Sequence, residues 1–148
     1  MQAEITAAVA VAQAGDHPTA RARFAAIWDR LGPAGDPFHR CVLAHHAADV
    51  QADPAEELRW DLRAIAAADE ITDERARRHH PALDVAAFFP SLHLNLADVY
   101  RRLGDRDRAA DHVERARQVV DTLEDDGYGR MIRAGLARCA ARLAEPAG

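Results

Sequence analysis

The 148-residue sequence predicts an all-α fold, and three observations support this. Glycine, proline and aspartate clusters mark helix ends at intervals along the chain. Much of the apolar content is alanine and only 5% of the residues are aromatic, a composition that favours packed helices over sheets. The apolar residues also recur at helical spacing. The clearest stripe is Ala20, Phe24, Ile27, Trp28 and Leu31.

The first half of the chain is expected to form four helices. A turn at residues 15–18 ends the first helix and starts the second, with Asp16 as its N-cap. A glycine- and proline-rich stretch at residues 32–37 ends the second helix and caps the third. Asp53 and Pro54 open the fourth, in the arrangement typical of a helix start. Its predicted apolar face consists of Leu58, Leu62, Ile65 and Ala66.

The second half begins with an expected insertion at residues 70–89. Thr72 starts a short fifth segment, and Pro81 and Pro90 bound an irregular stretch that contains Phe88 and Phe89. Ser91 begins a strong helix that Gly104 ends. A seventh helix is expected over residues 106–123 and a final helix over residues 127–145, which gives about seven to eight helices in all. The apolar face of the seventh is predicted to be Ala109, Val113, Ala116 and Val120.

Composition and charge exclude several classes of protein. The formal charge of −5 argues against a dedicated nucleic-acid binder, which would carry a basic face. No apolar run approaches the ~20 residues that span a bilayer, and the N-terminus carries Glu4 and no basic region typical of a signal peptide. Cys41 and Cys139 lack metal-site spacing and are expected to be buried free thiols. We therefore expect a cytoplasmic protein with no membrane partner.

Residues 90–123 closely resemble a tetratricopeptide repeat, a helix-turn-helix unit that recurs in solenoid proteins. Small residues allow the two helices to approach closely, and a glycine supplies the backbone freedom for the turn between them. Asp121 stands where the repeat usually closes with proline. The matching positions are Asn95, Leu96, Ala97, Tyr100, Gly104, Ala109 and Ala116.

The resemblance extends to the N-terminus, where Ala8, Gly15, Ala20 and Phe24 occupy equivalent positions. A degenerate middle copy is expected over residues 36–69. The resemblance thus implies one domain over residues 1–148, with repeats at 1–34, 36–69 and 90–123 and a capping helix at 127–145. Its fold would be an antiparallel helix-pair solenoid with a right-handed superhelix.

Tetratricopeptide proteins bind partners in a concave groove lined by the first helix of each pair, and the resemblance assigns such a groove here. The residues that carry the partner-binding prediction are His39, Val42, His46, Asp49, Ser91, Leu94, Asp98, Arg101 and Arg102. Gln2, Ile5, Val9 and Gln13 would line its N-terminal part. Because lysine is absent and Leu94 and Asp98 flank Asn95, the peptide-carboxylate clamp of chaperone-binding relatives is not expected.

The histidines suggest an alternative, a small-molecule or metal-binding regulatory protein that uses His39, His46 and Asp49. His46 and Asp49 lie one turn apart on a helix and could share a ligand, whereas the adjacent His45 points about 100° away. The pair His79–His80 lies within the insertion. His93 is expected to be a packed, hydrogen-bonded histidine.

The sequence favours an interaction module over an enzyme. It contains no GxSxG, no glycine-rich phosphate loop and no HExxH. We therefore predict a scaffold or adaptor that binds a protein or peptide, with no cofactor and no metal. Homodimerisation through an exposed helix face is also considered, and an enzyme with a site in the groove is the least favoured alternative.

Overall fold

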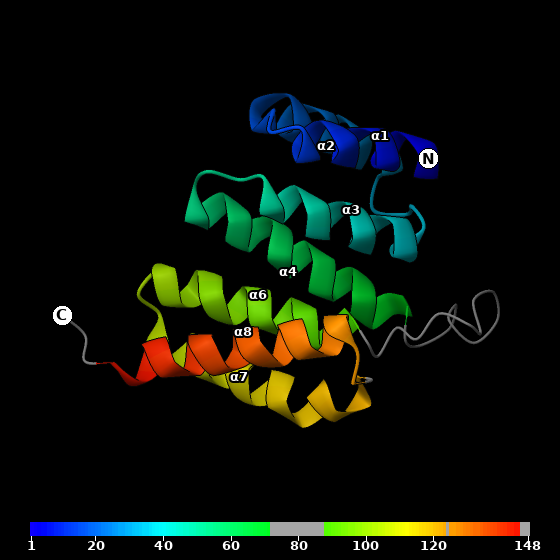
Figure 1. Ribbon diagram of the computed structural model, residues 1–148. Helices are drawn as coiled ribbons and strands as arrows, with labels where there is room; N and C mark the ends of the chain where they lie inside the picture. Colours follow the sequence, from blue (N-terminus) through cyan, green and yellow to red (C-terminus); the bar gives the residue numbers. More distant parts are fainter. Residues whose placement is uncertain (72–87, 124, 146–148) are drawn as a thin grey trace. The chain divides into compact units, whose positions relative to one another are not determined.

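The computed structural model describes residues 1–71, 88–123 and 125–145, and in these ranges the chain is helical without any β-strand (Figure 1). The described helices are α1 (Gln2–Gln13), α2 (His17–Leu31), α3 (Pro37–Asp49), α4 (Pro54–Glu70), α6 (Phe88–Arg102), α7 (Arg106–Val119), the 3₁₀ turn η3 (Val120–Thr122) and α8 (Gly127–Ala144). The predicted all-α class is confirmed for this part of the chain.

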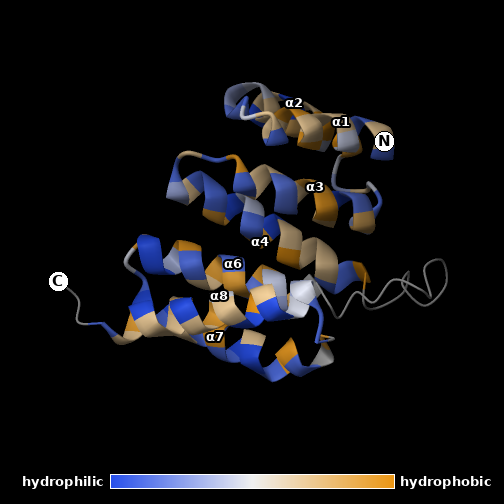
Figure 2. Ribbon diagram, viewed as in Figure 1, coloured by the Kyte–Doolittle hydropathy of each residue, from blue (hydrophilic) through white to orange (hydrophobic). Residues whose placement is uncertain are grey.

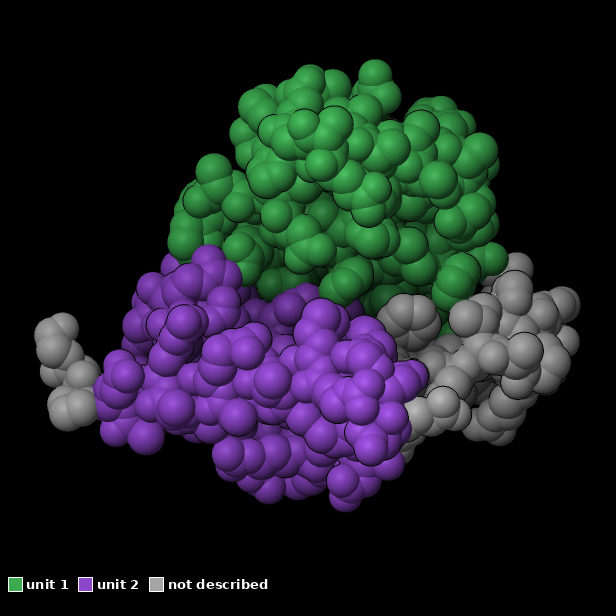
Figure 3. Space-filling model, viewed as in Figure 1, with its two compact units in different colours: residues 1–73 green, residues 74–148 purple. Residues whose placement is uncertain are grey.

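The chain forms two compact units, residues 1–73 and residues 74–148 (Figure 3). In unit 1, α1 packs against α2 and α3 against α4, and α3 also contacts both α1 and α2. In unit 2, α6 packs against α7, and α8 lies on both of them. Within each unit, the helix that follows a pair therefore covers both members of that pair. Each helix carries both apolar and hydrophilic residues, which is how amphipathic helices bury one face (Figure 2).

Aspartates cap most of the helices. Asp16 accepts a hydrogen bond from the backbone N–H of Thr19 at 3.3 Å, which confirms the predicted start of α2. Equivalent aspartate caps begin α3, α4, α7 and α8, and each satisfies a backbone donor that the helix itself leaves unpaired. These caps are Asp36 on α3, Asp53 on α4, Asp105 on α7 and Asp126 on α8.

The turns after α1 and after α6 have the same geometry. Gly15 has φ +93° and Gly104 has φ +88°, the left-handed conformation that glycine adopts at low cost. The following aspartate N–H bonds to a carbonyl five residues earlier, from Asp16 to Val11 at 3.3 Å and from Asp105 to Tyr100 at 2.9 Å. This pattern is a Schellman C-cap. The glycine–aspartate pair thus ends one helix and caps the next in both units.

Small residues at equivalent distances from these glycines form the helix contacts. Ala8 and Ala20 in unit 1, and Ala97 and Ala109 in unit 2, are all 0% exposed. Without side chains beyond Cβ, these positions let the paired helices approach closely. The remaining space is filled by Phe24 in unit 1, also 0% exposed, and by residues such as Val113 in unit 2.

The predicted apolar face of α4 is wrong. Leu62 is 41% exposed, Ala66 is exposed, and Leu58 and Ile65 are only half-buried. The buried residues of α4 are Trp60, Asp61, Ala64, Ala67 and Ala68. The prediction followed the large aliphatic residues, whereas this helix packs an alanine face against the alanines Ala44, Ala47 and Ala48 of α3.

Two tryptophans and an arginine join α2 to α4. The rings of Trp28 and Trp60 meet edge to face with 5.4 Å between centroids. The Arg63 guanidinium lies 5.2 Å from the Trp28 ring and 4.6 Å from the Trp60 ring. Such cation–π contacts contribute roughly 0.5–1 kcal/mol each at partly exposed positions.

The predicted start of α6 is also wrong. The helix begins at Phe88, so Phe88 and Phe89 are helical and do not belong to an irregular stretch. Pro90 is tolerated because it lies in the first turn, where backbone N–H groups have no helical partner. At the other end of unit 2, α7 ends at Val119 and η3 continues to Thr122, close to the predicted end. The predicted fifth segment and the His79–His80 pair lie outside the described residues.

Candidate functional site

Unit 1 contains an open pocket of about 290 Å³ beside the contact between α1 and α3. Its apolar lining comes from Val9, Ala12, Phe24 and Val50, and its polar lining from Gln13, His17, His46 and Asp49. Arg21 donates a hydrogen bond of 2.6 Å to the Val50 carbonyl and so holds the end of α3 against α2. The pocket therefore joins an apolar floor to a rim of hydrogen-bonding groups.

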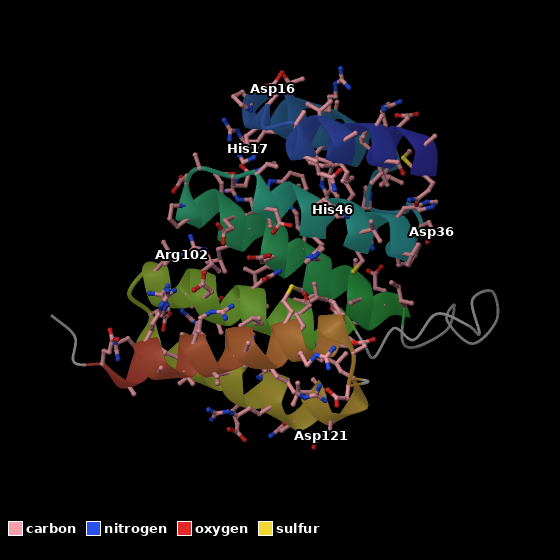
Figure 4. All side chains as sticks on the ribbon, viewed as in Figure 1. Asp16, His17, Asp36, His46, Arg102 and Asp121 are labelled. Carbon is pink, nitrogen blue, oxygen red and sulfur yellow. The ribbon has the colours of Figure 1, made fainter. Side chains whose placement is uncertain are left out.

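The rim of this pocket, which we call the α1–α3 pocket, is set by helix register. His46 and Asp49 are three residues apart on α3, which places both on one side of the helix, and His17 stands in the first turn of α2 (Figure 4). Burial, followed by the neighbouring His45, lowers the pKa of His46, while Asp49 opposes the shift. His46 is therefore neutral at neutral pH and can both donate and accept a hydrogen bond.

Unit 2 contains a second pocket of about 260 Å³ between α6 and α8, which we call the α6–α8 pocket. Its lining residues are Leu94, Asn95, Asp98, Gly135, Arg138, Cys139 and Arg142. A Cβ atom on Gly135 would lie 2.8 Å from the Leu94 Cδ2 atom, so the bare backbone there allows α8 to approach α6. This pocket is more polar and more basic than the one in unit 1.

Two arginines of α6 hold the carboxylate of this pocket. Asp98 accepts hydrogen bonds from Arg101 at 2.9 Å and from Arg102 at 3.0 Å. Burial alone would raise the pKa of Asp98, but these hydrogen bonds and charges outweigh it and lower the pKa below its ordinary value. Asp98 is therefore a stable anion. The Cys139 thiol is correspondingly inert, because burial and then the Asp98 charge raise its pKa.

A pair of histidines lies between α6 and α7, away from both pockets. The Nδ1 atoms of His93 and His112 are 3.0 Å apart, so one ring donates a hydrogen bond to the other. Tyr100 stacks on His112 at an interplanar angle of 8°. Burial, followed by the charges of His112 and Arg115, lowers the pKa of His93 to about 4. The expectation of a packed, hydrogen-bonded His93 is confirmed: His93 is buried, and His112 beside it is half-buried.

The structure brings some of the predicted groove residues together and separates others. Val9, Gln13, His46 and Asp49 line the α1–α3 pocket, and Leu94 and Asp98 line the α6–α8 pocket, with Arg101 and Arg102 bound to Asp98. His39, Val42 and Ser91 line neither pocket. Ile5, predicted as a groove residue, is only 1% exposed and belongs to the core, because its side of α1 faces α2 and α3.

Sequence reasoning missed part of each pocket. His17 and Phe24 come from α2, which a groove made only of first helices does not include. Arg138 and Arg142 come from α8, which was predicted only as a capping helix. The available signal was the composition of α8, which has four arginines and no acidic residue between Gly127 and Ala144.

Among the described residues, no three histidine, cysteine, aspartate or glutamate side chains come close enough together to hold a metal ion. The His39 ring lies 6.1 Å from the Phe38 ring at a tilted angle of 51°, and His39 does not line the α1–α3 pocket. Among the described helices, none is long and apolar enough to cross a membrane.

Comparisons with known proteins identify no relative. No protein-family model, no curated protein and no solved structure matches the chain.

Proposed function

We propose that the protein is a non-catalytic interaction module that binds a peptide or protein partner, with the α1–α3 pocket as one contact. The observation that carries this proposal is the combination of an apolar floor, at Val9, Phe24 and Val50, with a rim that includes His46 and Asp49. Such a pocket suits an apolar side chain whose neighbouring backbone or polar groups bond to the rim.

The size of the pocket favours a side chain over a whole small molecule. At about 290 Å³ the α1–α3 pocket lies at the lower end of the roughly 300–1,000 Å³ typical of small-molecule sites. The side chains of Gln13, His17 and Asp49 make no hydrogen bond to another described residue, so their polar groups are available to a partner. The small-molecule alternative has no comparable support.

We also propose that the helix pairs belong to a tetratricopeptide-like solenoid. The supporting features are the shared glycine–aspartate turns, the buried alanines Ala8 and Ala97, and the way α3 and α8 each cover the pair before them. A cytoplasmic location is proposed from the two buried, free thiols of Cys41 and Cys139.

The test is quantitative recovery of partners from an extract of the native cell. The tagged protein and a His46→Ala/Asp49→Ala variant are compared by mass spectrometry. We expect proteins captured by the native chain to be lost with the double variant, because the rim can no longer bond to the partner while the exposed or half-buried positions leave the core intact.

His39→Ala is the matched control, since it removes a half-buried histidine of the same helix that does not line the pocket. The assignment of this pocket would be overturned if all three proteins recovered the same partners. It would also be overturned if His39→Ala lost as many partners as the double variant. Circular dichroism establishes that each variant is folded.

A further inference from the structure

Among the described residues of unit 2, Arg138 and Arg142 differ from the other arginines in having no ion-pair or carbonyl partner. Within the described residues, the other arginines of α6, α7 and α8 each contact a carboxylate or a backbone carbonyl. Arg138 and Arg142 form neither kind of contact there, although both are exposed. A guanidinium binds a carboxylate well because its planar donors match both oxygens.

The unpaired arginines lie at one place. Arg138 and Arg142 are four residues apart on α8, so their side chains are neighbours on the helix surface, about 5–6 Å apart at Cβ. Both line the α6–α8 pocket, where Leu94 provides an apolar contact. Among the described residues, the one carboxylate that lines this pocket, Asp98, is already held by Arg101 and Arg102. The pocket thus presents two available cations above an apolar side chain.

The surroundings favour a protein partner. The whole chain carries a charge of −5, which disfavours nucleic acid and anionic membranes as extended partners, whereas α8 by itself is purely basic. A short acidic segment can contact α8 without lying across the acidic remainder of the surface. Carboxylates one helical turn apart on such a segment would match the spacing of Arg138 and Arg142.

We propose that the α6–α8 pocket binds an acidic segment of a partner protein, with Arg138 and Arg142 each holding a glutamate or aspartate carboxylate and Leu94 contacting an apolar residue between them. This inference rests on the proposed function as an interaction module. It adds a second contact with the partner and names the chemistry of the partner segment bound there.

The test uses a fluorescein-labelled helical peptide with glutamates spaced one turn apart around a leucine, and the same peptide with glutamines. Binding is measured by fluorescence anisotropy. We expect the glutamate peptide to bind, the glutamine peptide to bind at least about tenfold more weakly, and Arg138→Gln/Arg142→Gln to lose about tenfold in affinity for the glutamate peptide. Added salt should weaken the native interaction more than that of the variant.

Arg117→Gln/Arg130→Gln is the matched control, because it removes the same charge from exposed arginines whose ion pairs are both long, at 3.9 Å. This control should stay within about twofold of the native affinity. The proposal would be overturned if the two double variants lost equal affinity for the glutamate peptide, or if the native protein bound the glutamate and glutamine peptides equally well. Binding to phosphatidylserine vesicles but not to the peptide would overturn it in favour of a membrane. Since the probe is synthetic, the outcome is independent of partner recovery through the α1–α3 pocket.

Discussion

The two units share a backbone arrangement but present different chemistry at their pockets. Val9 and Asp98 each stand six residues before the turn glycine of their unit, and each lines the local pocket. In unit 1 this position contributes to an apolar floor beside a neutral histidine. In unit 2 it carries an anion held by Arg101 and Arg102. The two units therefore share a framework of buried alanines and turn glycines, and the residues at equivalent positions between them give the two pockets different chemistry.

The aromatic residues allow the two units to be followed separately. Both tryptophans of the chain, Trp28 and Trp60, lie in unit 1, and both tyrosines, Tyr100 and Tyr128, lie in unit 2. Tryptophan fluorescence therefore reports on unit 1, and second-derivative tyrosine absorbance reports on unit 2. The comparison between units can be tested with one sample.

The largest expected effect distinguishes the two cores. Phe24→Ala should destabilise unit 1 by roughly 3–5 kcal/mol, because it leaves a large cavity at a position with no exposure. Val113→Ala, at the corresponding position of unit 2, should cost roughly 1.5–3 kcal/mol because it removes fewer buried carbon atoms than the loss of a phenyl ring. Urea denaturation followed by the two probes measures both values. A larger loss for Val113→Ala would contradict the assigned correspondence.

The histidine pair should make unit 2 sensitive to mild acid. His93 has a folded-state pKa of about 4, below its ordinary value of 6.5, and the pKa of His112 is lowered by burial and then by Arg115. The unfolded chain therefore binds more protons below pH about 6.5, so stability is complete above that pH and falls as the pH approaches 4. We expect a loss of about 1–2 kcal/mol between pH 7.5 and roughly pH 5.

The measurement is the urea midpoint of unit 2, read from the tyrosine signal at several pH values. His112→Gln should reduce this pH dependence, because it removes one titrating histidine and its charge beside His93, while the burial of His93 remains. Asp98 and Asp105, whose pKa values are lowered, contribute their own loss only below about pH 4, outside this window. A pH dependence unchanged by His112→Gln would show that other groups cause it.

The smallest expected effect compares the two turns. Gly15→Ala and Gly104→Ala should each cost about 1 kcal/mol, because alanine is strained at positive φ while nothing within 4 Å would clash with its Cβ. Since the turns have the same geometry, the two losses should agree within experimental error. Thermal denaturation of each variant gives the values, and a clear difference between them would mean that the turns are not equivalent.

The helix ends were predictable because they depend on local chemistry. Asp16, Asp53 and Gly104 act through hydrogen bonds or backbone angles within a few residues of themselves, and these features confirmed the predicted starts and stops. The face of α4 was not predictable in the same way. Whether α4 buries Leu62 or Ala64 depends on the alanines of α3 against which it packs, and these lie in another part of the sequence.

The pockets were predictable only in part for the same reason. His46 and Asp49 share a helix side, so their proximity follows from spacing, whereas His17 reaches the same pocket through the packing of α2. Arg138 and Arg142 can be distinguished only when it is known which other arginines of the unit form ion pairs with carboxylates. That is a property of the folded unit and not of the basic residues themselves.

The shared glycine–aspartate turn has a consequence for redesign. It sets the register of each helix pair through backbone atoms and a short aspartate side chain, and from the pocket-lining residue Ala12 it uses only the backbone carbonyl. Exchanging Val9, Ala12 and Gln13 for the residues at the same distances before Gly104, which are Asp98, Arg101 and Arg102, should therefore transfer a binding preference while leaving the turn intact. The protein would then serve as a design framework whose two pockets can be changed one at a time.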